Sequence, residues 1–180
     1  MLTTLEKVKK VLSVEDDSQD GTLTLQILAA SQAVENHCKR SFRRQTYIEI
    51  HSGGWNYISL RNYPVIEITS IKNGNEPVNG YQILSDGMVY RDKWPSGAHN
   101  LTVTYEAGYV LPSEATTDNP RTLPEAVELA CIFLVQHFVN TPVGVKSERV
   151  GDISVSYSDY EGELPAVVIS LLNPYVGRWV

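Results

Sequence analysis

The sequence predicts an α+β fold, in which a small α-helical bundle carries an inserted antiparallel β-sheet or barrel-like unit, followed by a β arm and a short helix. Near both ends of the chain, apolar residues recur at steps of three and four, the period of an amphipathic helix. From Thr46 to Tyr105, apolar and polar residues alternate over short stretches, as in half-buried strands. The pairs Asn73-Gly74 and Asp86-Gly87 favour hairpin turns between such strands.

Two helices are predicted before the β unit. The first follows a capping-box spacing between Thr3 and Glu6 and carries an apolar stripe from Leu5 to Leu12. The second is Leu23–Lys39, in which Leu28 is expected to widen the apolar stripe. Small residues on this helix allow close approach of another helix; they are Ala29, Ala30, Ser31 and Ala33.

The β unit is expected to consist of short strands. In the first strand, alternation places Ile48 and Ile50 on one face, with the other face taken by Tyr47, Glu49 and His51. The further predicted strands are Tyr57–Leu60, Val65–Ile71, Tyr81–Leu84, Met88–Tyr90 and Leu101–Tyr105.

The segment Leu123–Asn140 is predicted to be the central helix. Pro124 suits the first helical position, and Glu125 and Glu128 favour the positive end of the helix dipole. Apolar residues cover more than one face, so we expect several packing partners, among them Leu23–Lys39. Either the protomer's own helices or a neighbouring copy could cover the remaining apolar surface.

The chain after this helix is expected to form an arm over residues 145–157, a short helix from Leu164 to Leu172 and a tail over residues 173–180. We therefore expect a helical core made of residues 1–44 and 120–180, with residues 45–111 inserted as a β subdomain.

Composition excludes some functions. The chain has 180 residues, a net charge of −6 and no basic block, so nucleic acid is not bound by phosphate neutralisation. Cys38 and Cys131 are interpreted as buried reduced thiols. Neither a targeting segment nor a membrane span is recognised, so we expect synthesis in the cytoplasm and no membrane partner.

The sequence contains no convincing motif for a metal, phosphate or catalytic site. Residues 16–21 begin like a calcium loop, but Ile27 stands where a bidentate Glu is needed, so a turn that caps the next helix is the better interpretation. The basic residues Arg40, Arg43 and Arg44 are interpreted as a solvated helix end rather than a phosphate site. The four histidines lack metal-ligand spacing, and no catalytic motif is present. We expect no enzyme activity, no cofactor and no metal.

Several short sequence motifs occur in a fixed order along the chain. In the first half they are a Leu-Glu-x-Val-Lys-x-x-Leu helix, Cys38-Lys39-Arg40-Ser41-Phe42 and Tyr63-Pro64-Val65. In the second half they are Trp94-Pro95, Val103–Tyr109, Leu123-Pro124-Glu125-Ala126 and the arm up to Tyr157. In this order they resemble the head-to-tail connector (head completion adaptor) proteins of long-tailed double-stranded DNA phages and prophages.

The resemblance implies a non-enzymatic structural protein of the virion, located at the head-tail interface. Such connectors form a ring, usually a dodecamer, beneath the portal protein and extend the DNA channel towards the stopper or tail protein. DNA would pass through this channel without sequence-specific binding. Alternatives are another virion component, such as a tail-completion protein, or a generic β-rich interaction module. An enzyme whose site forms only in the fold is the third hypothesis.

Candidate residues for subunit or portal contacts lie on the arm and the tail, which head-to-tail packing between neighbours could use. On the arm they are Val145, Lys146, Glu148, Arg149, Ile153, Val155 and Tyr157. On the tail they are Tyr175, Arg178 and Trp179. The arm could instead pack on its own domain, and the tail could fold back on the chain.

Overall fold

A computed structural model describes residues 1–140, 147–150, 153–156 and 164–177 of the chain. The chain divides into two compact units. The helical unit comprises Met1–His37 and Pro124–Tyr175, and the β unit comprises Cys38–Leu123 and Val176–Val180. The predicted α+β class is confirmed, and the described strands form open sheets rather than a closed barrel.

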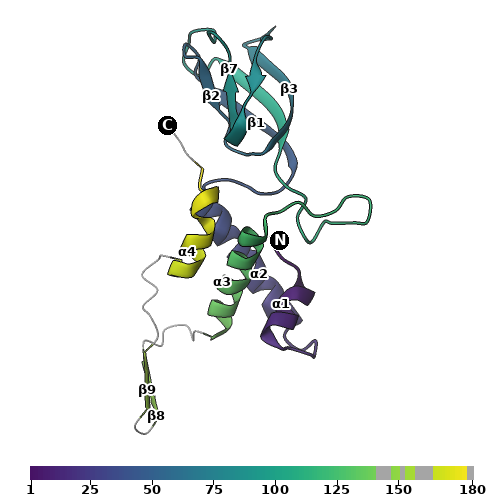
Figure 1. Ribbon diagram of the computed structural model, residues 1–180, viewed down its shortest axis with the longest axis vertical. Helices are drawn as coiled ribbons and strands as arrows, with labels where there is room; N and C mark the ends of the chain where they lie inside the picture. The colour runs from purple at the N-terminus through teal and green to yellow at the C-terminus, as the bar shows by residue number, and fades with distance from the viewer. Residues whose placement is uncertain (141–146, 151–152, 157–163, 178–180) are drawn as a thin grey trace. The chain divides into compact units, whose positions relative to one another are not determined.

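The helical unit is built from four α-helices in the described part of the chain (Figure 1). They are α1 (Leu5–Leu12), α2 (Asp20–Cys38), α3 (Glu125–Asn140) and α4 (Ala166–Leu172), and the 3-10 turn η2 (Asn173–Tyr175) follows α4. The predicted helices are thus present, with α2 beginning three residues earlier than its apolar stripe. The stripe of α2 is buried, and so is most of the apolar surface of α3.

The predicted packing of the second helix against the central helix is confirmed at Ser31 and Cys131. The Oγ of Ser31 lies 3.6 Å from the Sγ of Cys131, and the same Oγ donates to the Ile27 carbonyl at 2.7 Å. A small side chain on α2 thus lies directly against α3. Leu28 was wrongly assigned to this face, because its side chain is 49% exposed.

The start of α1 differs from the prediction by one residue. Thr4, not Thr3, is the N-cap, and its Oγ1 accepts from the backbone N–H of Lys7. Thr3 is buried instead, and its hydroxyl donates to the carboxylate of Glu128 on α3. Thr3, which the capping-box spacing predicted as the N-cap, therefore joins the N-terminal segment to α3.

The calcium-like segment is a turn held by a lysine. The ammonium of Lys9 lies 2.7 Å from carboxylate oxygens of both Asp17 and Asp20, while Asp16 accepts from the backbone N–H of Ser18 at 2.8 Å. Lys9 therefore supplies the positive charge for two of these acids. Asp20 lies inside α2, where an acid in the first turn is favoured by the helix dipole.

The β unit contains two antiparallel sheets. The first has the order β1-β7-β3-β4 and the second has the order β2-β6-β5. Their strands are β1 (Gln45–His51), β2 (Tyr57–Ser59), β3 (Val65–Asn73), β4 (Glu76–Pro77), β5 (Gln82–Ile83), β6 (Met88–Tyr90) and β7 (Leu101–Ala107). The core between them includes the fully buried side chains of Trp94, Tyr105 and Leu101. Alternate residues of the central strand β7 supply much of it.

Both predicted turns connect neighbouring strands. Asp86 and Gly87 have φ of 56° and 77° in the turn between β5 and β6, the left-handed backbone that this pair was chosen for. In the other turn, Asn73 pairs with Glu76, so the two linking residues are Gly74 and Asn75, one position later than predicted.

Arg40 was wrongly interpreted as part of a solvated helix end. It is only 4% exposed, and its guanidinium lies against the rings of Phe42 and Tyr63 while Nη2 donates to the Tyr63 carbonyl. Burial against aromatic faces suits a guanidinium better than an ammonium. Arg43 and Arg44 are exposed as expected, and each forms an ion pair, with Glu114 and Glu106.

Candidate interaction surfaces

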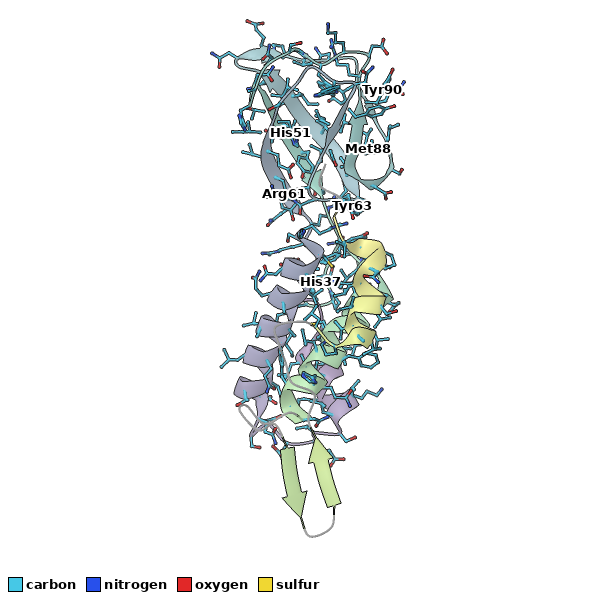
Figure 2. All side chains as sticks on the ribbon, turned by 90° about the vertical axis from the view of Figure 1, so that its left-hand side faces the viewer. His37, His51, Arg61, Tyr63, Met88 and Tyr90 are labelled. Carbon is cyan, nitrogen blue, oxygen red and sulfur yellow. The ribbon has the colours of Figure 1, made fainter. Side chains whose placement is uncertain are left out.

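The β unit has a groove of about 740 Å³ beside the strands β1 and β2. Its lining residues come from β1, from β2 and from the segments that flank them. They are Ile48, Glu49, Ile50, His51, Ser52, Trp55, Tyr57, Ile58, Ser59, Arg61 and His99. His51 and Arg61 lie on the same side of the β unit in Figure 2.

The apolar face of β1 points outward. Ile48 and Ile50 are 69% and 61% exposed, and Trp55 is 77% exposed. Successive side chains of a strand point to opposite faces, so this orientation turns Tyr47 and Glu49 towards the core. Isolated exposed apolar residues are ordinary, but four of them line this groove, with Tyr57 as the fourth, so we treat it as a candidate interaction surface.

The inward turn of Glu49 is explained by its hydrogen bonds. The Tyr105 hydroxyl and the backbone N–H of Arg61 both donate to its carboxylate, and Nε2 of His51 lies 3.0 Å away. Burial raises the pKa of Glu49, but the bonds from these partners lower it more, so the pKa lies below its ordinary value. The pKa of Tyr105 is raised, first by burial and then by its bond to this carboxylate.

The two strands along the groove are both edge strands in the described part of the chain. β1 ends the order β1-β7-β3-β4, and β2 ends the order β2-β6-β5. β1 pairs with β7 along all seven of its residues, from Gln45 to His51, so only its outer edge is open. An open edge presents unpaired N–H and C=O groups that can bind another strand.

The predicted arm contains a hairpin. β8 (Ser147–Val150) pairs with β9 (Ile153–Ser156) in antiparallel register, which places Glu148 opposite Val155 and Val150 opposite Ile153. Four of the candidate interface residues, Glu148, Arg149, Ile153 and Val155, therefore share one hairpin. The candidates Val145, Lys146 and Tyr157 lie outside the described residues.

The chain end returns to the β unit. Tyr175, a candidate interface residue, belongs to η2, and two residues later the backbone N–H of Gly177 donates to the Cys38 carbonyl at 2.9 Å. This bond joins the described part of the tail to the chain at Cys38. Arg178 and Trp179 lie outside the described residues.

The helical unit also exposes apolar side chains. Leu25 and Leu28 are exposed on α2, as are Leu129 and Val139 on α3 and Val167 on α4. A shallow pocket of about 350 Å³ lies beside α3 and α4, lined by Phe133, Gln136, His137, Pro165, Val167 and Val168. Most of the apolar surface of α3 is therefore buried, and among the described residues Leu129 and Val139 remain exposed on it.

Sequence reasoning missed the groove of the β unit. The signal was present, because Ile48, Ile50, Trp55 and Tyr57 are all large apolar residues close together in the chain. The alternation correctly separated the two faces of β1, but hydrophobicity alone does not indicate that the isoleucines face solvent. That orientation depends on Tyr105, which is 56 positions away from Glu49.

The described residues contain no cluster of three or more His, Cys, Asp and Glu side chains arranged to hold a metal ion. Within them, no helix is both long enough and apolar enough to cross a membrane.

Comparison with known proteins gives one family and several solved structures. Residues 1–177 match the family model described as head completion protein. The neck of an empty gene transfer agent (GTA) particle, computed with C6 symmetry, contains a similar chain, with a TM-score of 0.65 and 15% identity over 99% of this chain and 91% of that chain. The neck of a native GTA particle, computed with C12 symmetry, gives 0.58 and 16% over 91% and 86%. No curated protein gives a significant match. At these identities the structural likeness shows a shared fold.

Proposed function

We propose, from the premise that this chain belongs to the head completion protein family, that it is a non-enzymatic connector in the neck of a phage-like particle. In this proposal it assembles as a ring beneath the portal protein and extends the DNA channel to the stopper or tail protein. The observation that carries the proposal is the family match over residues 1–177, which includes both the helical unit and the β unit.

Ring assembly is supported by the distribution of exposed apolar residues. A closed ring of identical subunits requires two different surfaces on each copy, because each contact joins unlike faces of neighbours. The groove of the β unit is one such surface, and the exposed leucines of α2 and α3 provide another. The similar chains belong to necks computed with C6 and C12 symmetry, and we extend that ring symmetry to this protein.

A DNA channel is compatible with the charge of the chain. The net charge is −6, so copies in a ring would repel the phosphate backbone rather than bind it. DNA could then slide through the channel without a sequence-specific contact. The groups with clear pKa shifts also have structural explanations, such as the burial of Cys131 against α2 and the bonds of Glu49 within the β unit. We therefore propose a structural role rather than catalysis.

The arm and the tail are proposed as contact segments of the ring. The residues proposed on the arm are Val145, Lys146, Glu148, Arg149, Ile153, Val155 and Tyr157, and those on the tail are Tyr175, Arg178 and Trp179. The hairpin is suited to subunit contacts, because its two strands pair with each other and it can bind a neighbour without disturbing the fold of either unit.

In-vitro complementation tests this function. DNA-filled heads and finished tails are prepared from particles that lack the protein, and purified protein is incubated first with one component and then with the other. We expect that treated heads join untreated tails, giving tailed particles in electron micrographs. Joining that requires treatment of the tails instead would support the tail-completion alternative. Tailed particles that form without the protein would exclude both functions.

A further inference from the structure

We propose that the groove of the β unit binds the β8–β9 hairpin of a second copy of this chain, which adds a strand to the outer edge of β1. The proposal rests on the proposed function in one respect, because ring assembly is what brings two copies together. It identifies the groove as the acceptor of the subunit contact and the arm as the donor.

The acceptor is an open edge with an apolar border. The inner edge of β1 is satisfied by β7 along its whole length, and no described strand pairs with its outer edge. Beside that edge, the exposed side chains of Ile48 and Ile50 border a groove that Trp55 and Tyr57 also line. Strand addition uses this combination, in which main-chain bonds give affinity and alternate side chains occupy apolar contacts.

The donor is a hairpin without a further partner among the described residues. β8 and β9 pair with each other and with no other described strand. An isolated two-stranded hairpin is at best marginally stable in water, so it requires another surface to become fixed. Its four-residue strands are short enough to lie along the seven-residue edge of β1.

The sequences of donor and acceptor match in period. In β9, Ile153 and Val155 alternate with Ser154 and Ser156. In β1, Ile48 and Ile50 alternate with inward residues. Because both strands repeat every second residue, one register places the apolar residues of β9 on the same face of the sheet as the isoleucines of β1. Ile153 and Val155 would then lie beside Ile48 and Ile50 on one face of the extended sheet.

A second copy is the favoured occupant because the donor and acceptor are different surfaces of the same chain. Such a heterologous contact repeats from copy to copy and closes into a ring when the rotation between neighbours permits it. Addition of this hairpin to β1 would give the hairpin a partner, close the open edge of β1 and provide apolar neighbours for Ile48 and Ile50. The proposal would be wrong if the groove bound a segment of the portal, stopper or tail protein, or the hairpin of its own chain.

Disulfide trapping between two populations of full-length chain tests this directly. One population carries Ile50→Cys, and the second, tagged to a different mass, carries Val155→Cys. The native thiols of Cys38 and Cys131 are buried and interfere little. Ile83→Cys replaces Ile50→Cys in the control, because Ile83 is also an exposed isoleucine on an edge strand of the β unit but does not line the groove. Both mixtures are oxidised gently in the presence of the portal protein, and native mass spectrometry records ring formation.

We expect mixed disulfide dimers to exceed the control by at least about tenfold, since the contact raises the local thiol concentration. Ile50→Glu should weaken ring assembly at least about tenfold, whereas Ile83→Glu should not. Rings that form with equal trapping of both pairs would overturn the inference and leave the proposed function intact. A third sample carries Ile50→Cys and Val155→Cys in the same chain, and a bond that forms only within that chain, with none between copies, would overturn the second-copy occupant. A chain that stays monomeric with and without portal would overturn the proposed function and this inference with it.

Discussion

The Lys7 ammonium lies 2.8 Å from the carboxylate of Glu128, whose side chain is only 2% exposed. Thr3 donates to the other oxygen of the same carboxylate, so the N-terminal segment is fixed to α3 by two polar contacts. A buried carboxylate that loses its cation is costly, because the charge remains without full solvation.

Removal of the cation should therefore destabilise the helical unit. Lys7→Met is expected to lower the free energy of unfolding by about 1–2 kcal/mol, a value reduced by the partial exposure of Lys7. Lys10→Met is the matched control, because Lys10 is an exposed lysine on the same helix and should change stability by less than about 0.5 kcal/mol. Denaturant titration of both variants gives the comparison. Equal effects would show that the ion pair does not stabilise the fold.

The thiols should be protected from alkylation in the folded protein. Burial raises the pKa of Cys131 to about 11, so very little thiolate is present near pH 8. We expect both cysteines to react with a thiol reagent at least about 100-fold more slowly in the native protein than in denaturant. Fast reaction of the native protein would contradict the packing of α2 against α3.

Alkaline pH should destabilise the packing of Cys131 on α3 against Ser31 on α2. The folded pKa of Cys131 lies above its ordinary value of 9.0, so its contribution to stability is complete below that value and is lost as the pH rises towards about 11. We expect the melting temperature to fall across this range. The decline should be smaller in Cys131→Ala relative to its own value at pH 8, and an identical pH profile would contradict the assignment.

Acid should destabilise the β unit through Glu49. Its folded pKa is below the ordinary value of 4.5, so its contribution is present above that pH and is lost as the pH falls through the lower folded pKa. Glu49→Gln should therefore remove part of the acid sensitivity measured by circular dichroism. Glu67→Gln, on strand β3 of the same sheet, is the control and should change the acid profile less than Glu49→Gln.

The tail can be tested separately from the fold. Deletion of residues 178–180 keeps Gly177 and its bond to Cys38, so the melting temperature should change little. We predict at least about fivefold weaker binding to portal, because Trp and Arg are the residues most enriched at binding hot spots. Unchanged portal binding would remove Arg178 and Trp179 from the proposed contact.

The sequence predicted those features that depend on local periodicity. The stripe of α2, the burial of both cysteines, the antiparallel strands and the turn at Asp86 and Gly87 all follow from short-range patterns, and all are present. The arm was likewise predicted as β structure, and its described residues, 147–150 and 153–156, pair as two antiparallel strands.

The features that were missed depend on partners far away in the chain. Arg40 is buried because the ring of Tyr63 lies across its guanidinium. Thr3 does not cap α1, because its hydroxyl donates to the Glu128 carboxylate instead. The exposed face of β1 follows from the bond between Glu49 and Tyr105. In each case a tertiary hydrogen bond or ring contact outweighs the local preference, and a single sequence does not reveal such a partner.

Native mass spectrometry of the purified chain, alone and mixed with the portal protein of the same particle, tests whether the chain is a neck connector. We expect a complex in which the chain forms a ring with the same copy number as the portal, even if the chain alone is monomeric. A chain that remains monomeric in both samples, with no mass corresponding to a portal complex, would contradict the claim that it is a neck connector.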